Sequence, residues 1–345
     1  VTDDVLIQGG NLEISIDASY ASRIFNVSSG DRVGFGKLNL VEGRADNGGA
    51  ILSSGTGTVL LVDSTLSENV ATQSGGAIFI ADGKLFASNI VLSQNSTLGS
   101  GGAFFSSSGL SVFRGGTFHS NSAEFDGGAV AIDGGNLLLI DSEVGAEGRA
   151  NTAGNSLASG RGDGGGIHVS GTGRVAVDGG AIGFNVARLD GGGIWTGDSG
   201  FVSIRNDAVV SDNVASSFDA GSHGGGGICN DGATVFLRDS SVARNRASGD
   251  GATGGGVLSQ GGILRVVDSI FAENFASDSG GGIGLVTGNA VLRGATITEN
   301  MAGIAGFRAA LDLVQKQRKD ESSRVAALSR KLLDGIQAQC SDVQL

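Results

Sequence analysis

The chain has 345 residues, of which 63 are glycine and none is proline, and its formal net charge is −12. Collagen is excluded because glycine does not recur at every third residue and proline is absent, and the 40% hydrophobic content argues against a disordered linker. The acidic charge disfavours binding to nucleic acid, and no apolar run approaches the roughly 20 residues of a membrane-spanning helix. A regular array with glycine turns remains.

Residues 1–47 form the first predicted segment. They lack the glycine marker of the following repeats, but apolar and polar residues alternate over 12–16 as expected for a strand with one buried face. We predict that this segment forms the first coils or an N-terminal cap.

Residues 48–306 are predicted to form the repeat array. The tetrapeptide Gly-Gly-(Ala/Gly)-(aliphatic or Phe) occurs nine times at intervals of 26 to 37 residues, starting at Gly48, Gly75, Gly101, Gly127, Gly164, Gly191, Gly225, Gly254 and Gly280. An asparagine near the end of each unit keeps the same rhythm, at Asn69, Asn95, Asn121, Asn185, Asn213, Asn245, Asn274 and Asn300.

Each unit has room for two or three short strands and none for a helix between them. Such strands cannot bury a face alone, so the units must stack on one another. The sequence therefore predicts an all-β fold, a single right-handed parallel β-helix of about ten coils. Two apolar columns are expected to form its core, one after the glycine pair (Ile51, Ile78, Phe104, Val130, Ile167, Ile194, Ile228, Val257, Ile283) and one three residues before each asparagine (Leu66, Leu92, Phe118, Ile182, Val210, Val242, Phe271, Ile297).

The glycine and asparagine markers have a structural interpretation. Glycine supplies a positive φ at a tight corner, and asparagine is the next most tolerant residue there. Stacked asparagine amides can also hydrogen-bond along the solenoid axis. Neither marker indicates a catalytic or ligand-binding role.

The paired motif resembles the repeats of chlamydial polymorphic membrane proteins and related bacterial surface proteins. Residues 118–121 and 271–274 match Phe-x-x-Asn, and residues 48–51 and 75–78 match its partner Gly-Gly-Ala-Ile. The resemblance covers approximately residues 10–302. It implies a right-handed β-helix that serves as a secreted or surface-displayed passenger, often adhesive.

Residues 307–345 differ in composition from the repeats. They are rich in Arg, Lys, Gln, Ala and Leu, and four apolar residues are spaced as one helical face, at Val325, Leu328, Leu332 and Ile336. We predict an α-helical C-terminal cap or tail. It either covers the last coil or binds a partner.

An enzyme of the polysaccharide lyase, hydrolase or epimerase type on a pectin-lyase-like fold is the alternative to a binding protein. Lyase chemistry needs an acidic Ca²⁺ site and a base, and hydrolysis needs paired carboxylates. The repeated Asp-Ser pairs, at Asp63, Asp141, Asp239 and Asp268, suit turn corners better than one active site. The three histidines fit no metal-ligand spacing. No catalytic residue, metal site or cofactor is assigned.

The position just after the aliphatic core residue is expected to face outward, because neighbours in a strand point to opposite faces. Its most prominent occupants are Phe79, Phe105, His168 and Trp195. An exposed stripe of such rings would bind a sugar or dock a protein. Inserted loops or the N-terminal segment could instead cover it. A second candidate, the tripeptide Arg161-Gly162-Asp163, has the sequence that integrins recognise, but short matches arise readily by chance.

The function that the sequence favours is a non-catalytic, extracellular or surface-displayed scaffold of the adhesin or binding type, associated with the outer membrane. Its expected partner is a glycan or a protein of a host or neighbouring surface. Nucleic acid is not expected as a partner, and this chain is not expected to span a membrane.

Overall fold

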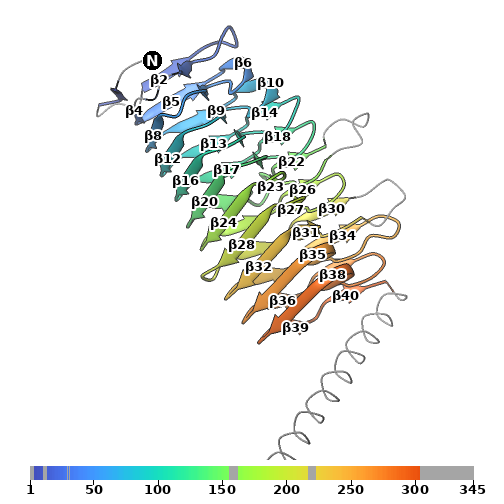
Figure 1. The fold of residues 1–345 in the computed structure, drawn as a ribbon. Helices are drawn as coiled ribbons and strands as arrows, with labels where there is room; N and C mark the ends of the chain where they lie inside the picture. Colours follow the sequence, from blue (N-terminus) through green and yellow to red (C-terminus); the bar gives the residue numbers. More distant parts are fainter. Residues whose placement is uncertain are drawn as a thin grey trace, which may run out of the picture.

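The computed structural model describes residues 4–10, 14–28, 30, 32–154, 162–216 and 223–303. Every described strand pairing in the sheets is parallel, and each strand inside a sheet pairs with its counterparts in the coil before and the coil after, whereas the strands at the sheet ends pair on one side. The result is an elongated parallel β-solenoid, along which the chain progresses coil by coil from β1 to β40 (Figure 1). The predicted all-β solenoid is confirmed, with eleven strands in one of its sheets.

The first and largest sheet has 19 strands in two adjacent columns. The column that follows the glycine pairs contains β3 (Phe25–Val27), β7 (Ile51–Ser53), β11 (Ile78–Ile80), β15 (Phe104–Ser106), β19 (Val130–Ile132), β23 (Ile167–Val169), β27 (Ile194–Gly197) and β31 (Ile228–Asp231). The second column contains β1 (Val5–Gln8), β4 (Arg32–Gly36), β8 (Thr58–Val62), β12 (Lys84–Ser88), β16 (Leu110–Arg114), β20 (Asn136–Ile140), β24 (Arg174–Asp178), β28 (Phe201–Arg205) and β32 (Thr234–Arg238). The long strands β35 (Val257–Val267) and β38 (Ile283–Arg293) run through both columns.

Two smaller sheets complete each coil. The 11-stranded sheet contains β2 (Ile14–Asp17), β5 (Leu38–Val41), β9 (Thr65–Ser67), β13 (Val91–Ser93), β17 (Thr117–His119), β21 (Glu143–Val144), β25 (Ala181–Gly183), β29 (Val209–Ser211), β33 (Ser241–Ala243), β36 (Ile270–Ala272) and β39 (Thr296–Thr298). The 10-stranded sheet contains β6 (Arg44–Asn47), β10 (Val70–Ser74), β14 (Ser96–Thr97), β18 (Ser122–Ala123), β22 (Thr152–Ala153), β26 (Val186–Ala187), β30 (Val214–Ser216), β34 (Arg246–Ser248), β37 (Phe275–Ala276) and β40 (Met301–Ala302).

Left-handed backbone conformations mark the corners of the coils. The first glycine of each pair is one such corner, as at Gly75 with φ of +63°. The second glycine is required for a different reason, because a side chain on Gly76 would overlap the backbone of Gly102 in the next coil. The marker Gly-Gly therefore combines one conformational and one steric requirement.

The asparagine of each coil is not itself the left-handed residue. The residue before it has the positive φ, as at Glu68 with φ of +57°, whereas Asn69 lies inside the coil, fully buried. Its Nδ2 donates to Oδ1 of Asn95 at 3.0 Å and to the Leu40 carbonyl at 3.1 Å. Of the two interpretations of the asparagine marker, the amide ladder along the axis is correct and the corner is wrong.

The two predicted apolar columns form the core. Residues of both columns are fully buried in the central coils, including Ile194 after the glycine pair and Phe118 before the asparagine. In the last described coil the same column becomes accessible, and the side chain of Ile297 is 51% exposed. The core is therefore continuous along the axis and is open at this coil among the described residues.

Residues 1–47 and 307–345 flank the repeat array. Within residues 1–47, strands β1, β2 and β6 pair with β4, β5 and β10, so the described part of this segment belongs to the same three sheets. The predicted helical tail at 307–345 lies outside the described residues. Within the described ranges, no helix has the length and apolar character needed to cross a membrane.

Candidate binding site on the outward column

The residues that follow the core positions form one continuous column, which is half-buried at the four rings and buried at Ala131, Cys229 and Leu258. Strand pairing places these residues opposite one another from coil to coil, in the order Asn26, Leu52, Phe79, Phe105, Ala131, His168, Trp195, Cys229, Leu258 and Gly284. We call this row the outward column. All four residues predicted for the site lie in it, on β11, β15, β23 and β27, and each is half-buried.

The four rings are arranged as two stacked pairs. The ring centroids of Phe79 and Phe105 are 5.1 Å apart with planes at 9°, and those of His168 and Trp195 are 4.5 Å apart with planes at 3°. Parallel rings at this spacing must lie face to face, because coplanar rings would overlap. Their faces therefore point along the solenoid axis and their edges point outward, rather than forming the flat strip of ring faces that a sugar-stacking stripe would present.

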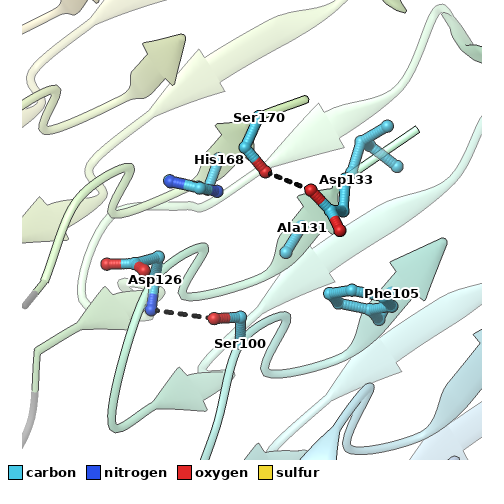
Figure 2. A pocket seen from close by; sticks show the side chains of 8 residues that line it. Ser100, Phe105, Asp126, Ala131, Asp133, His168 and Ser170 are labelled. Carbon is cyan, nitrogen blue, oxygen red and sulfur yellow. Dashed lines mark hydrogen bonds between the residues drawn. The ribbon is translucent and has the colours of Figure 1, made fainter. Parts of the chain in front are cut away.

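Ala131 interrupts the ring stack between the two pairs. Its small side chain leaves a pocket of about 220 Å³, lined by Phe105 on one side and His168 on the other. Figure 2 shows Ala131 between these two rings. Ala131 is itself only 1% exposed, and it is the one position of the column between Phe79 and Trp195 that carries no ring. We call this space the Ala131 slot.

Carboxylates stand on both sides of the Ala131 slot. Asp126 and Asp133 line it together with the hydroxyl-bearing Ser100 and Ser170. The Ser170 hydroxyl donates to Asp133 Oδ1 at 2.9 Å, and the Asp126 amide donates to Ser100 Oγ at 3.4 Å (Figure 2). The slot thus combines aromatic walls with acidic edges.

A row of carboxylates runs along the corner that precedes the glycine pairs. Asp126 Oδ1 accepts hydrogen bonds from the amides of Gly162 and Asp163, and Asp163 Oδ1 accepts one from the Asp190 amide at 3.0 Å. Asp190 Oδ2 lies 3.0 Å from His223 Nδ1. Burial, reinforced by the neighbouring carboxylates of Asp190 and Asp126, raises the pKa of Asp163 to about 8.

This raised pKa predicts a pH-dependent stability. Between about pH 4 and pH 8 the folded protein holds a proton on Asp163 that the unfolded chain releases, so stability falls as the pH rises through this window. Asp163→Asn mimics the protonated acid and should raise the unfolding midpoint at pH 8.5 by several degrees, corresponding to a few kcal/mol. The two midpoints should converge near pH 4.5, as measured by thermal unfolding across pH.

Asp46→Asn is the matched control for this prediction, because Asp46 is exposed and accepts a hydrogen bond from the Thr72 hydroxyl that asparagine can also accept. It removes one carboxylate outside the row, and its unfolding midpoint at pH 8.5 should lie close to that of the unsubstituted protein. A constant difference between Asp163→Asn and the unsubstituted protein from pH 4.5 to 8.5 would contradict a titrating Asp163.

The other sequence-predicted residues are not assembled into a site. Asp63, Asp141, Asp239 and Asp268 all have φ between +44° and +47°, which places them at left-handed corners in different coils. Within the described ranges, no group of three or more His, Cys, Asp or Glu side chains could hold a metal ion. In the integrin-type tripeptide, Asp163 belongs to the carboxylate row, while Arg161 lies outside the described residues.

Two features of the structure were not predicted from the sequence. The carboxylate row had a signal, since Asp126, Asp163 and Asp190 each directly precede a glycine pair. The second feature is an apolar stripe on the adjacent strand column, where Leu60 and Phe86 pair in register and are 39% and 37% exposed. Its signal was the unbroken apolar run at 59–62, in which alternation between core and surface is lost.

Comparison with known proteins identifies the repeat. Residues 63–81 match the family model of the Chlamydia polymorphic membrane protein repeat, and this segment contains both Asn69 and the marker that starts at Gly75. The protein is therefore a parallel β-solenoid with a repeat of this type. No curated protein and no solved structure matches the chain.

Proposed function

We propose that this protein is a non-catalytic, surface-displayed scaffold of the adhesin type, which binds a partner molecule through the outward column. The observation that carries the proposal is the alignment of four half-buried rings in one column, at the outer surface of a rigid stack of coils. Aromatic rings at a rigid surface bind with little loss of conformational entropy, which is why they are enriched at contact surfaces.

The match to a polymorphic membrane protein repeat supports surface display, and the acidic charge supports a partner other than nucleic acid. The aspartates of the repeated Asp-Ser pairs occupy the corners of separate coils, so they give the polysaccharide-active alternative no assembled pair of carboxylates. A scaffold needs only a rigid surface with suitable chemistry, and the column provides one.

A binding screen with a turnover assay tests this function. The full purified chain is applied to arrays of glycans and of cell-surface proteins, and each ligand that binds is then incubated with the protein and examined for cleavage or epimerisation. We expect saturable binding without turnover. Turnover of a bound polysaccharide would show that the protein is an enzyme and not a non-catalytic scaffold. The absence of any bound ligand from both arrays would also contradict the proposed function.

A further inference from the structure

We propose that the Ala131 slot receives the guanidinium group of an arginine side chain from a partner protein. This inference rests on the proposed function and names the partner chemistry of its central contact. Phe105 and His168 lie two coils apart, which is roughly 9–10 Å along the axis at the usual spacing between parallel strands. One planar group inserted at the level of Ala131 would face a ring on each side.

The size of the slot favours a single side chain. Its volume of about 220 Å³ is below the roughly 300–1,000 Å³ of pockets that enclose a whole small ligand. A sugar chain would need accessible ring faces along the column, but the two stacked pairs cover each other's faces. The observations therefore favour a protein with a protruding planar group over a glycan.

The charge of the slot favours a cation. The carboxylates of Asp126 and Asp133 lie on opposite sides of it, and the whole chain carries a net charge of −12. A guanidinium group is planar, always charged and weakly hydrated, so it can stack between rings while its edge donates hydrogen bonds to carboxylates. A lysine ammonium group carries the same charge but is not planar, so it cannot stack between two rings in this way.

The solenoid itself stacks arginine against phenylalanine from one coil to the next. The guanidinium carbon of Arg246 lies 4.6 Å from the ring centroid of Phe275, and that of Arg174 lies 5.5 Å from the ring centroid of Phe201. Both pairs are register neighbours on adjacent coils. The coil spacing of this fold is thus suited to a guanidinium packed on an aromatic ring.

The test uses Trp195 as the reporter, because it is the only tryptophan of the chain and stacks on His168. Its fluorescence is followed while the full protein is titrated with three blocked tripeptides, Gly-Arg-Gly, Gly-Lys-Gly and Gly-citrulline-Gly, at constant ionic strength. We expect a saturable response to the arginine peptide, with affinity at least about fivefold above that for the lysine and citrulline peptides. Equal responses to all three peptides, or no saturable response to arginine, would overturn the proposal.

Two variants locate the binding. Ala131→Phe places a ring in the slot, in a column that already accepts stacked phenylalanines, and should reduce arginine affinity at least about tenfold. Leu60→Phe is the matched control, because it adds a ring beside Phe86 on the adjacent strand column, outside the outward column, and should leave arginine affinity unchanged. Asp133→Asn should weaken arginine binding several-fold. Unchanged affinity in Ala131→Phe would overturn the assignment to the slot.

The partner from the binding screen separates this proposal from the proposed function. We expect Ala131→Phe to lose that partner while Leu60→Phe keeps it. If Trp195→Ala loses the partner and Ala131→Phe keeps it, the column is a binding surface but the slot proposal is wrong. A glycan as the only partner would also overturn the slot proposal and would leave the scaffold function standing.

Discussion

Ile194→Asp is expected to unfold the protein at ambient temperature or to lower its unfolding midpoint drastically. Ile194 is fully buried on β27, between Ile167 and Ile228 of the adjacent coils. A carboxylate at this position would have aliphatic neighbours above and below and no partner for its charge. The expected cost is above about 4 kcal/mol, measured by thermal or urea unfolding.

Two controls accompany this variant. Ile194→Val shortens the same side chain by one methyl group and should cost about 1 kcal/mol. Val62→Asp introduces the same carboxylate on β8 at a side chain that is 43% exposed, and should change the free energy of unfolding by less than about 0.5 kcal/mol. If Ile194→Asp and Val62→Asp have the same unfolding midpoint, the register of the core columns is wrong.

Asn185→Ala is the second substitution with a large expected effect, because it breaks the buried amide ladder in the middle of the solenoid. Asn185 Oδ1 accepts from Asn151 Nδ2 at 2.9 Å, and its Nδ2 donates to Asn213 Oδ1 at 2.9 Å and to the Val144 carbonyl at 2.8 Å. The substitution leaves polar groups of neighbouring coils without these partners away from water. We expect a loss of about 3–5 kcal/mol in the free energy of unfolding.

Asn136→Ala is the matched control, since Asn136 is exposed at the start of β20. It should cost less than about 0.5 kcal/mol in the same urea titration. Similar losses in the two variants would mean that the ladder contributes no more than a surface asparagine, which would contradict its role as the polar support of the solenoid.

The sequence predicts the fold well because each coil repeats the same arrangement of glycine pair, apolar core positions and asparagine. Ile51 and Ile78 occupy the same phase after a glycine pair, and strand pairing places them opposite each other. Where a coil contains an insertion, the equivalent positions are harder to find in the sequence. Asn151 completes the ladder between Asn121 and Asn185, but its position after the irregular segment 145–150 concealed its equivalence to the other asparagines.

The candidate site was predicted only in part. The alternation of strand side chains placed Phe79 and Trp195 in one outward column, and the pairing agrees with this placement. The direction of the ring faces depends on side-chain torsions and on contacts between coils, which a linear pattern does not contain. A Cβ on Gly197 would overlap the Trp195 ring, so this glycine, too, sets where the ring lies. The Ala131 slot follows from these contacts.

The function of the outward column is tested most directly by Trp195→Ala, compared with Phe86→Ala as a control that removes a ring from the adjacent apolar stripe. For each variant, affinity for a ligand found in the screen and the unfolding midpoint are measured on the same preparation. Because Trp195 is half-buried, we expect its removal to cost about 1–2 kcal/mol of stability, leave the chain folded, and weaken binding at least about fivefold. Phe86→Ala should bind normally. Full affinity in Trp195→Ala, or loss of binding in Phe86→Ala alone, would contradict the assignment of binding to the outward column.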